Sequence, residues 1–157
     1  MSLNQEVDLL RSIPLFQNME PSKLKLLAFT AERLTFEPGQ MLFRQGDPGD
    51  ALYIVVEGEA EVFIDSADGE LHLAEIGRNA PVGEMAIVGD VPRSASVRAT
   101  SALVTLKISK ELFFRLVNEF PQIAVEIMRV LATRLEHTNT QLRAAEAELR
   151  RLQADGP

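Results

Sequence analysis

The sequence of 157 residues contains no cysteine, which excludes a disulfide framework and any metal site built from thiolates. Its two histidines, His72 and His137, are far apart in the chain, so surface positions are a better interpretation than a clustered metal site. No segment approaches the roughly 20 apolar residues of a membrane span, and Met1–Leu10 lacks the apolar run of a signal peptide. We therefore expect a cytoplasmic protein that does not enter a membrane by itself.

An excess of basic residues is also missing. Lys and Arg number 16 against 23 Asp and Glu, which gives a net charge of −7 and no basic stripe of the kind that binds nucleic acid. Hydrophobic residues make up 46% and charged residues 25%, which is typical of one folded globular domain. Catalytic triads, Walker loops and metal clusters are not evident. We expect no enzyme activity and no nucleic-acid partner.

The chain divides into three segments by its hydrophobic pattern. Residues 1–32 have helical spacing, and a second helix is expected to begin near Pro21. Residues 33–108 consist of short runs that alternate apolar and polar positions, separated by turn signals such as Pro38-Gly39 and Asp68-Gly69. This pattern predicts an all-β roll or barrel.

Helices return in residues 109–157. Ser109 is a good N-cap for a short helix that ends before Pro121, and a longer helix is expected from about Gln122 to Ala154. The long helix has an apolar heptad pattern: Met128, Leu131, Leu135, Thr138, Leu142, Ala145, Leu149 and Leu152. We expect the pattern to be core up to about Leu135. Beyond Leu142 it predicts a parallel homodimer, with folding back onto the roll or docking on a partner domain as the alternatives.

Segment 83–96 combines residue types that suit a ligand with a phosphate and a sugar. Gly83 opens a helical turn, where backbone N–H groups can approach an anion. The guanidinium of Arg93 can hold two phosphate oxygens, and the carboxylate of Glu84 can accept from a sugar hydroxyl. Spacing alone supports a surface turn with a solvated Glu84 and Arg93 equally well.

The same segment closely resembles the phosphate-binding cassette of the cyclic-nucleotide-binding family. That family includes the regulatory subunits of protein kinase A, the catabolite activator protein and nucleotide-gated channels. Its pattern reads Gly-Glu-Leu-Ala, a short spacer, and Pro-Arg-small-Ala-Thr or Ser. Departures are Val82, where an aromatic residue or isoleucine is common, and Asn79, where glycine is usual. Other landmarks of the resemblance are Ile13–Phe16, Gly39 ahead of Phe43, Gln45–Asp47 and Tyr53–Gly58.

The resemblance implies a mainly β fold, an eight-stranded, jelly-roll-like β-roll (a double-stranded β-helix) with flanking helices. It also implies cAMP or cGMP as the ligand and gives roles to single residues. Glu84 would accept from the ribose 2′-hydroxyl, and Arg93 would pair with the cyclic phosphate. The backbone N–H groups of Ala86 and Ser94, and the Ser94 hydroxyl, would bond phosphate oxygens. The other ligand-binding residues that it implies are Gly83, Met85 and Ala95 in the cassette, and Val62 and Leu73 at the base pocket.

Two further polar residues have alternative interpretations. Counting from Arg93 into the long helix reaches Thr138, where the activator protein has a threonine that contacts the adenine amino group. Thr138 is equally a polar d position of the heptad pattern. Ser94 and Ser96 both fit plain strand positions, and the cassette context favours a ligand role for Ser94 only.

The resemblance therefore implies a sensor domain that couples cyclic-nucleotide binding to movement of its C-terminal helix, with no cofactor besides that ligand. No helix-turn-helix segment follows the long helix. We expect the chain to regulate an effector protein, or to be the sensor portion of a larger polypeptide, rather than to bind DNA. The alternative is an interaction module that keeps the β-roll and dimerises without nucleotide. The presence of both Glu84 and Arg93 argues against that alternative.

Overall fold

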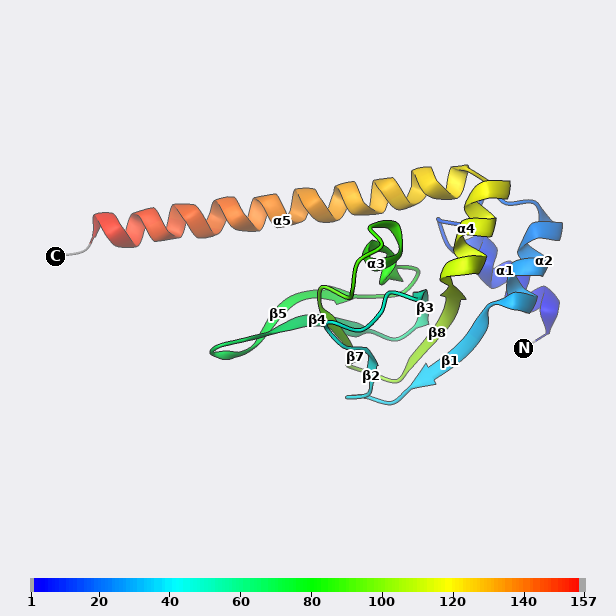
Figure 1. Ribbon diagram of the computed structural model, residues 1–157, viewed down its shortest axis with the longest axis horizontal. Coiled ribbons are helices and arrows are strands. Elements are labelled where there is room, and N and C mark those ends of the chain that lie inside the picture. Colours follow the sequence, from blue (N-terminus) through cyan, green and yellow to red (C-terminus); the bar gives the residue numbers. More distant parts are fainter. Residues whose placement is uncertain (1, 156–157) are drawn as a thin grey trace.

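The computed structural model describes residues 2–155, which form a β-roll flanked by helices (Figure 1). Its N-terminal helices are α1 (Leu3–Ser12) and α2 (Pro21–Thr30), and α2 begins at the expected proline. The strands are β1 (Glu32–Phe36), β2 (Met41–Phe43), β3 (Ala51–Glu57), β4 (Ala60–Ser66), β5 (Gly69–Ile76), β6 (Pro81–Val82), β7 (Ser96–Ala99) and β8 (Leu103–Ser109). The remaining helices are α3 (Glu84–Val88), α4 (Lys110–Glu119) and α5 (Gln122–Ala154).

Two antiparallel four-stranded sheets form the roll, in the orders β1-β8-β3-β6 and β2-β7-β4-β5. Strand β3 is buried on both faces. Leu52 and Ile54 join the core under the helices, whereas Tyr53 and Val55 join the core between the sheets. This double burial explains why β3 is a continuous apolar run. The predicted eight-stranded β-roll with flanking helices is confirmed, and the sheets are not closed into a barrel.

The alternation of apolar residues predicts neither β6 nor β7, since strands of two and four residues are too short for a period of two to be recognised. The turn before β6 contains Asn79 at φ +69°, a left-handed conformation that asparagine tolerates better than most residues. The Asn79 N–H donates to the Val55 carbonyl over 2.8 Å. The departure from glycine at this position is therefore compatible with the turn.

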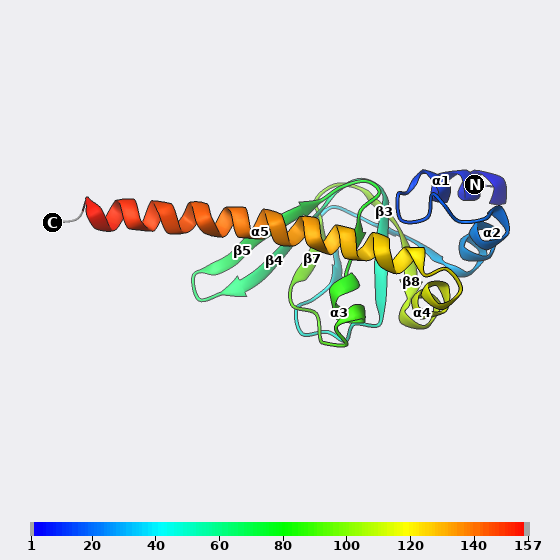
Figure 2. The same cartoon turned by 90° about the horizontal axis from the view of Figure 1, so that it is seen from above.

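Helix α5 passes over α3 and then extends beyond the roll (Figures 1 and 2). Ile127 is buried in the core and Leu131 is partly buried against it. The expectation that the heptad pattern is core up to Leu135 is wrong for Met128 and Leu135, which are 60% and 61% exposed. At 3.6 residues per turn, these two side chains lie about a quarter turn around the helix from Ile127. The helix thus packs on the roll through Ile127 and Leu131, while Met128 and Leu135 of the heptad stripe stay exposed.

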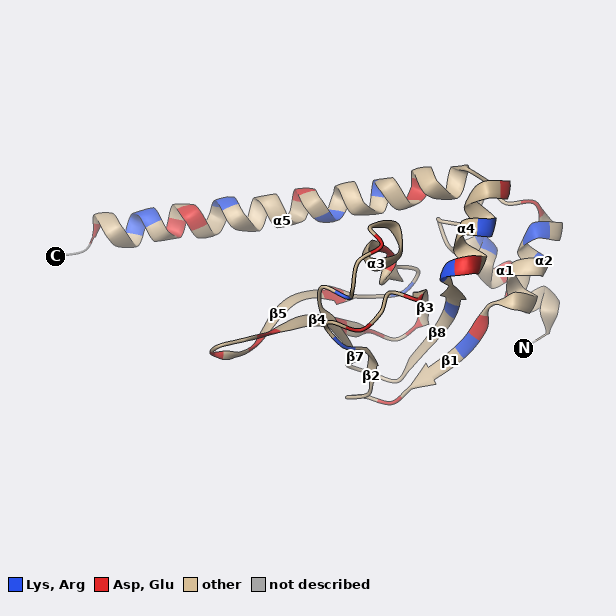
Figure 3. Cartoon of the chain, in the orientation of Figure 1, with Lys and Arg blue, Asp and Glu red and all other residues tan. Residues whose placement is uncertain are grey.

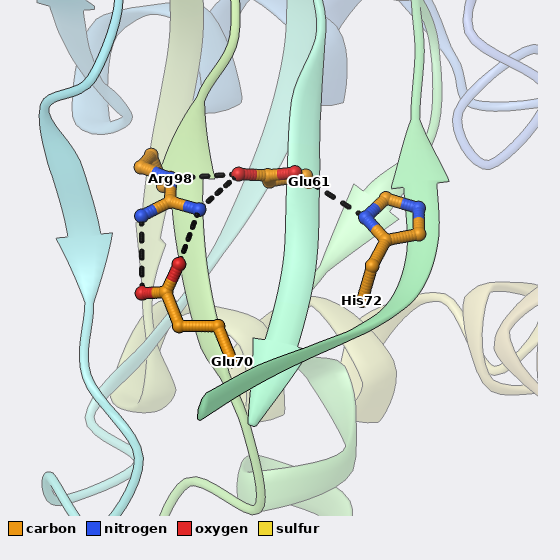
Figure 4. A network of polar contacts seen from close by, with 4 residues as sticks. All are labelled: Glu61, Glu70, His72 and Arg98. Carbon is orange, nitrogen blue, oxygen red and sulfur yellow. Dashed lines mark hydrogen bonds and ion pairs between the residues drawn. The ribbon is translucent and has the colours of Figure 1, made fainter. Parts of the chain in front are cut away.

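The outer face of the second sheet carries a network of charges (Figure 4). Arg98 donates from Nε to Glu61 over 2.7 Å, and from Nη1 and Nη2 to Glu70 over 3.2 and 3.1 Å. The guanidinium carbon lies 4.2 Å from the Phe63 ring centroid, and His72 Nδ1 lies 3.3 Å from Glu61 Oε2. Hydrogen bonding to Arg98 lowers the pKa of the Glu61 carboxyl. Each charged group in this surface network has a partner.

Candidate ligand-binding site

The cassette (residues 83–96) is held by two close backbone approaches. Gly83 has φ +88°, and a Cβ there would lie 2.5 Å from Arg93 Nη1 and 3.2 Å from the Phe43 ring. Both its conformation and its surroundings therefore require glycine. In the loop before β3, a Cβ on Gly49 would lie 2.4 Å from the Cβ of Ala86. Glycine at this position lets the loop pack directly on α3.

Arg93, near the end of the cassette, is buried, with 4% of its surface exposed. Its Nη1 donates to the Gly83 carbonyl over 2.7 Å, and its Nη2 donates to the Ala51 carbonyl. The guanidinium carbon is 4.0 Å from the Phe43 ring centroid, a cation–π distance, and Nη2 is 3.9 Å from Asp50 Oδ1. Burial lowers the pKa of Arg93, and nearby acidic groups oppose this shift.

The guanidinium of Arg93 therefore ties the start of the cassette to the start of β3. Its Nε is buried and has no hydrogen-bond partner within residues 2–155. A buried donor without a partner is costly in a folded protein, and such atoms occur mainly where a ligand or water completes the bonding. The fold thus leaves the Nε–H of Arg93 without an acceptor inside the cassette.

Glu84, the first residue of α3, has no exposed surface. Its Oε1 accepts from Nη1 of Arg134, which lies on α5 and also donates to the Pro81 carbonyl. Its other oxygen, Oε2, is buried and accepts no hydrogen bond from the described part of the chain. An ionised carboxylate can only accept, so the group that would satisfy Oε2 is a donor such as a sugar hydroxyl. The surface-turn interpretation of Glu84 and Arg93 does not fit this burial.

Arg134 is the residue that the sequence pattern does not predict. It is 50 positions from Glu84, so no local motif links the two. A signal was nevertheless present, because Arg134 precedes Thr138 by one helical turn and shares its face of the helix. The Thr138 hydroxyl donates to the Arg134 carbonyl over 2.9 Å.

The residues expected to bind the phosphate differ in how exposed they are. Ser94 is exposed, and its hydroxyl makes no hydrogen bond with residues 2–155, whereas Ala86 and Ala95 are buried and Met85 is 56% exposed. Ser96 differs from Ser94, since it is buried and its Oγ accepts from the Gln45 N–H over 2.8 Å. This structural role agrees with the interpretation of Ser96 as a strand residue.

The positions expected at the base pocket lie on the neighbouring hairpin and on α5. Val62 on β4 packs partly buried against the core between the sheets, and Leu73 on β5 is 42% exposed. Thr138 is exposed on α5. The structure therefore does not bring Thr138 into a buried contact.

The sequence model of the cyclic nucleotide-binding domain matches residues 33–120, more than half of the chain, and this range includes the whole cassette. The chain belongs to the cyclic nucleotide-binding domain family. The buried Glu84 and Arg93 thus occupy the cassette of a family member.

Relatives of this cyclic nucleotide-binding domain include regulators and lysophospholipases. The CRP-like cAMP-activated global transcriptional regulator of Mycobacterium tuberculosis is 29% identical over 136 residues, 86% of this chain and 61% of the relative. The cAMP-dependent protein kinase regulatory subunit of Blastocladiella emersonii is 34% identical over 115 residues, 73% of this chain and 28% of the relative. The solved structure of the Thermus thermophilus catabolite activator protein has a TM-score of 0.74 and 30% identity, covering 85% of this chain and 63% of that one. The chain spans less than two thirds of each of these proteins.

Within residues 2–155, no group of three or more His, Asp or Glu side chains could hold a metal ion, and His72 contacts Glu61. No helix in this part of the chain is both long and apolar enough to cross a membrane.

Proposed function

We propose that this domain is a sensor that binds cAMP, with cGMP as the weaker ligand, and reports binding through α5. The observation that carries the proposal is the buried Oε2 of Glu84, which lacks a partner while Oε1 is held by Arg134. A ribose 2′-hydroxyl donating to Oε2 would complete the bonding of this carboxylate. The cyclic phosphate would then lie at the N–H groups of Ala86 and Ser94, above Arg93.

The proposed coupling uses contacts that join the cassette to the C-terminal helices. Lys110, the first residue of α4, donates from its N–H to the Asp50 carbonyl over 2.9 Å and pairs with Asp90 over 2.8 Å. Arg134 joins α5 to Glu84. A ligand that orders the cassette would act on both helices through these contacts. It shifts the equilibrium between two arrangements only by its difference in affinity for them.

The preference for cAMP rests on two hydroxyls. Thr138 Oγ1 can accept from the adenine 6-amino group, although its hydroxyl can also donate to the guanine carbonyl. Ser94 Oγ can reach the guanine amino group, which makes the preference modest. Side-by-side titrations of the two nucleotides test it, and tighter binding of cGMP would contradict it.

The decisive experiment is a double cycle that combines Glu84→Ala with 2′-deoxy-cAMP. If Oε2 accepts from the 2′-hydroxyl, removing either partner abolishes the same bond, so the two losses of affinity are strongly non-additive by calorimetry. Glu59→Ala, at an exposed carboxylate after β3, is the matched control and should leave both affinities unchanged. Additive losses would move Glu84 out of the ribose site, and no cAMP binding by the unmodified chain would refute the proposal.

A second proposed activity is homodimerisation through α5, whose heptad stripe is exposed. Met128, Leu135, Leu142 and Leu149 follow each other at intervals of seven, and each is more than half exposed. Acidic and basic residues are interspersed along the same helix (Figure 3), so opposite charges can flank a seam. A parallel pair would bury this stripe, which is otherwise a liability for a helix that extends from the roll.

Sedimentation equilibrium at micromolar concentration tests the dimer. We expect a dimer that dissociates when residues 140–157 are deleted or when Leu142→Glu is introduced, whereas Arg143→Gln has no such effect. A monomer at saturating cAMP would exclude the parallel dimer, and a dimer that survives the deletion would place the interface elsewhere.

The proposed sensor function also implies a cellular compartment and an effector that reads its output. We propose a cytoplasmic, non-catalytic regulator whose output is read by an effector protein or by a domain fused to it. The net charge of −7 favours a protein partner over nucleic acid for this domain. A nucleotide-independent interaction module is the competing function, and the cAMP titration above separates the two.

A further inference from the structure

A pocket of about 440 Å³ lies beside the contact between α5 and the cassette. Its walls are Pro14 and Leu15 after α1, the segment 78–81 that leads into β6, and the face of α5 from Glu126 to Arg134. No residue of the cassette lines it, and neither do Val62 and Leu73. The pocket is therefore distinct from the proposed nucleotide site, and Arg134 belongs to the boundary between the two.

The lining of the pocket combines apolar and basic groups. The surface of the pocket is mainly apolar, and Leu15, Pro81 and Val130 are among its lining residues. Three arginines line it against a single acidic residue, Glu126, although the whole chain carries a net charge of −7. This local reversal of charge is a feature of binding sites for anions.

The three arginines differ in what they already bind. Arg129 donates to Glu126 over 2.7 Å, and Arg134 donates to Glu84 and to the Pro81 carbonyl. Arg78 is exposed and has no hydrogen-bond or ion-pair partner in the described residues 2–155. The pocket thus presents the unpartnered guanidinium of Arg78 and part of the guanidinium of Arg134 beside an apolar wall. Such a surface matches a ligand with an anionic head and an apolar body.

We propose that this pocket binds a small organic carboxylate with an apolar acyl or aryl body, and that this ligand antagonises the nucleotide. The carboxylate would pair with Arg78 and attract Arg134, while the apolar body would cover Val130 and Leu15. The antagonism rests on the proposed function, because it requires that Glu84 serve the nucleotide. Arg134 has a single guanidinium, which Glu84 already binds. A carboxylate in the pocket would compete with Glu84 for that guanidinium and so disturb the proposed ribose site.

Binding is tested with octanoate as the probe and octanamide as its uncharged counterpart. Calorimetry on the full chain should show binding of octanoate and at least tenfold weaker binding of octanamide. Arg78→Gln should weaken octanoate binding at least fivefold, whereas Arg115→Gln, at an exposed arginine on α4 away from the pocket, should not change it. Val130→Asp should abolish binding by placing a carboxylate in the wall, and its melting curve shows whether it is folded. Equal effects of Arg78→Gln and Arg115→Gln, or equal binding of octanamide, would overturn the proposal.

The antagonism is tested by titrating cAMP with and without saturating octanoate. We expect the apparent Kd of cAMP to rise at least threefold, and cAMP to weaken octanoate by the same factor because coupling is reciprocal. Unchanged cAMP affinity would refute the antagonism. Complete displacement of octanoate by cAMP, with no effect of Val130→Asp, would place octanoate in the nucleotide site and overturn the pocket. Octanoate binding that depends on Arg78 in a chain without cAMP binding would refute the proposed function and leave the pocket standing.

Discussion

The outer face of the second sheet and the cassette both bring arginines close to carboxylates, and the two regions differ in how completely the hydrogen bonds of these groups are made. On the outer face of the second sheet, Arg98 binds Glu61 and Glu70 (Figure 4). Its guanidinium also lies over the Phe63 ring. At the cassette, Glu84 and Arg93 are more deeply buried, yet Glu84 Oε2 and Arg93 Nε have no partner among residues 2–155.

The exposed groups have complete hydrogen bonding and the buried groups do not, which is the reverse of what is usual in folded proteins. Unmade hydrogen bonds are most costly in the interior, so a fold optimised for stability alone would complete the bonds of its buried polar groups first. The charged groups on the sheet surface all have partners. Under the proposed function, a ligand supplies the bonds that the buried Glu84 and Arg93 lack. Three substitutions test this contrast.

The largest effect is expected from Arg93→Ala. Loss of one partner of a buried charge contact should weaken cAMP binding by about 2–5 kcal/mol. Because Arg93 also binds the Gly83 and Ala51 carbonyls, the melting temperature should fall as well. Arg93→Lys should also bind weakly, since an ammonium group cannot reproduce the planar fork. Calorimetry that gives a near-native affinity for Arg93→Ala would contradict the assignment of the phosphate site.

A smaller effect is expected from Arg134→Gln, which leaves the buried Glu84 carboxylate without its charged partner. We expect the free energy of unfolding in urea to fall by about 1–3 kcal/mol, which is less than for a fully buried pair. The expected effect is smaller than for a fully buried pair because the side chain of Arg134 is 33% exposed, so solvent screens its charge. The double variant with Glu84→Gln should recover part of the loss. Arg143→Gln is the control, and an equal loss there would show that the Arg134 contact is unimportant.

The smallest effect is expected from Glu61→Gln in the surface network. Arg98 lowers the pKa of the folded Glu61 carboxyl below its ordinary value of 4.5. The group therefore stabilises the fold above that ordinary value, and the stabilisation is lost as the pH falls through the lowered pKa. The melting temperatures of the unmodified chain and Glu61→Gln should converge as the pH drops below about 4. A constant difference across this range, or a change in cAMP affinity, would show that the network does more than support the sheet.

The sequence predicts the fold and the cassette because both depend on local patterns. Turn signals and alternation indicate the β-roll, and Gly83, Glu84 and Arg93 lie within a single motif. Arg134 is not predicted, since its contact with Glu84 depends on how α5 crosses the cassette. The heptad pattern likewise gives the period of an apolar stripe without stating which face packs on the roll. Met128 and Leu135 were therefore assigned to the core although they are exposed.

Because α5 is long, a small tilt near the roll would move its distal end by a larger distance. Its 33 residues span about 50 Å at 1.5 Å per residue, and about 30 Å of that length lies beyond Arg134. If Arg134 acts as the fulcrum, a tilt of about 10° displaces the distal end by roughly 5 Å, about the rise of one helical turn. A rearrangement of side chains around one carboxylate can thus become a displacement large enough to change the register of whatever the tip of α5 contacts.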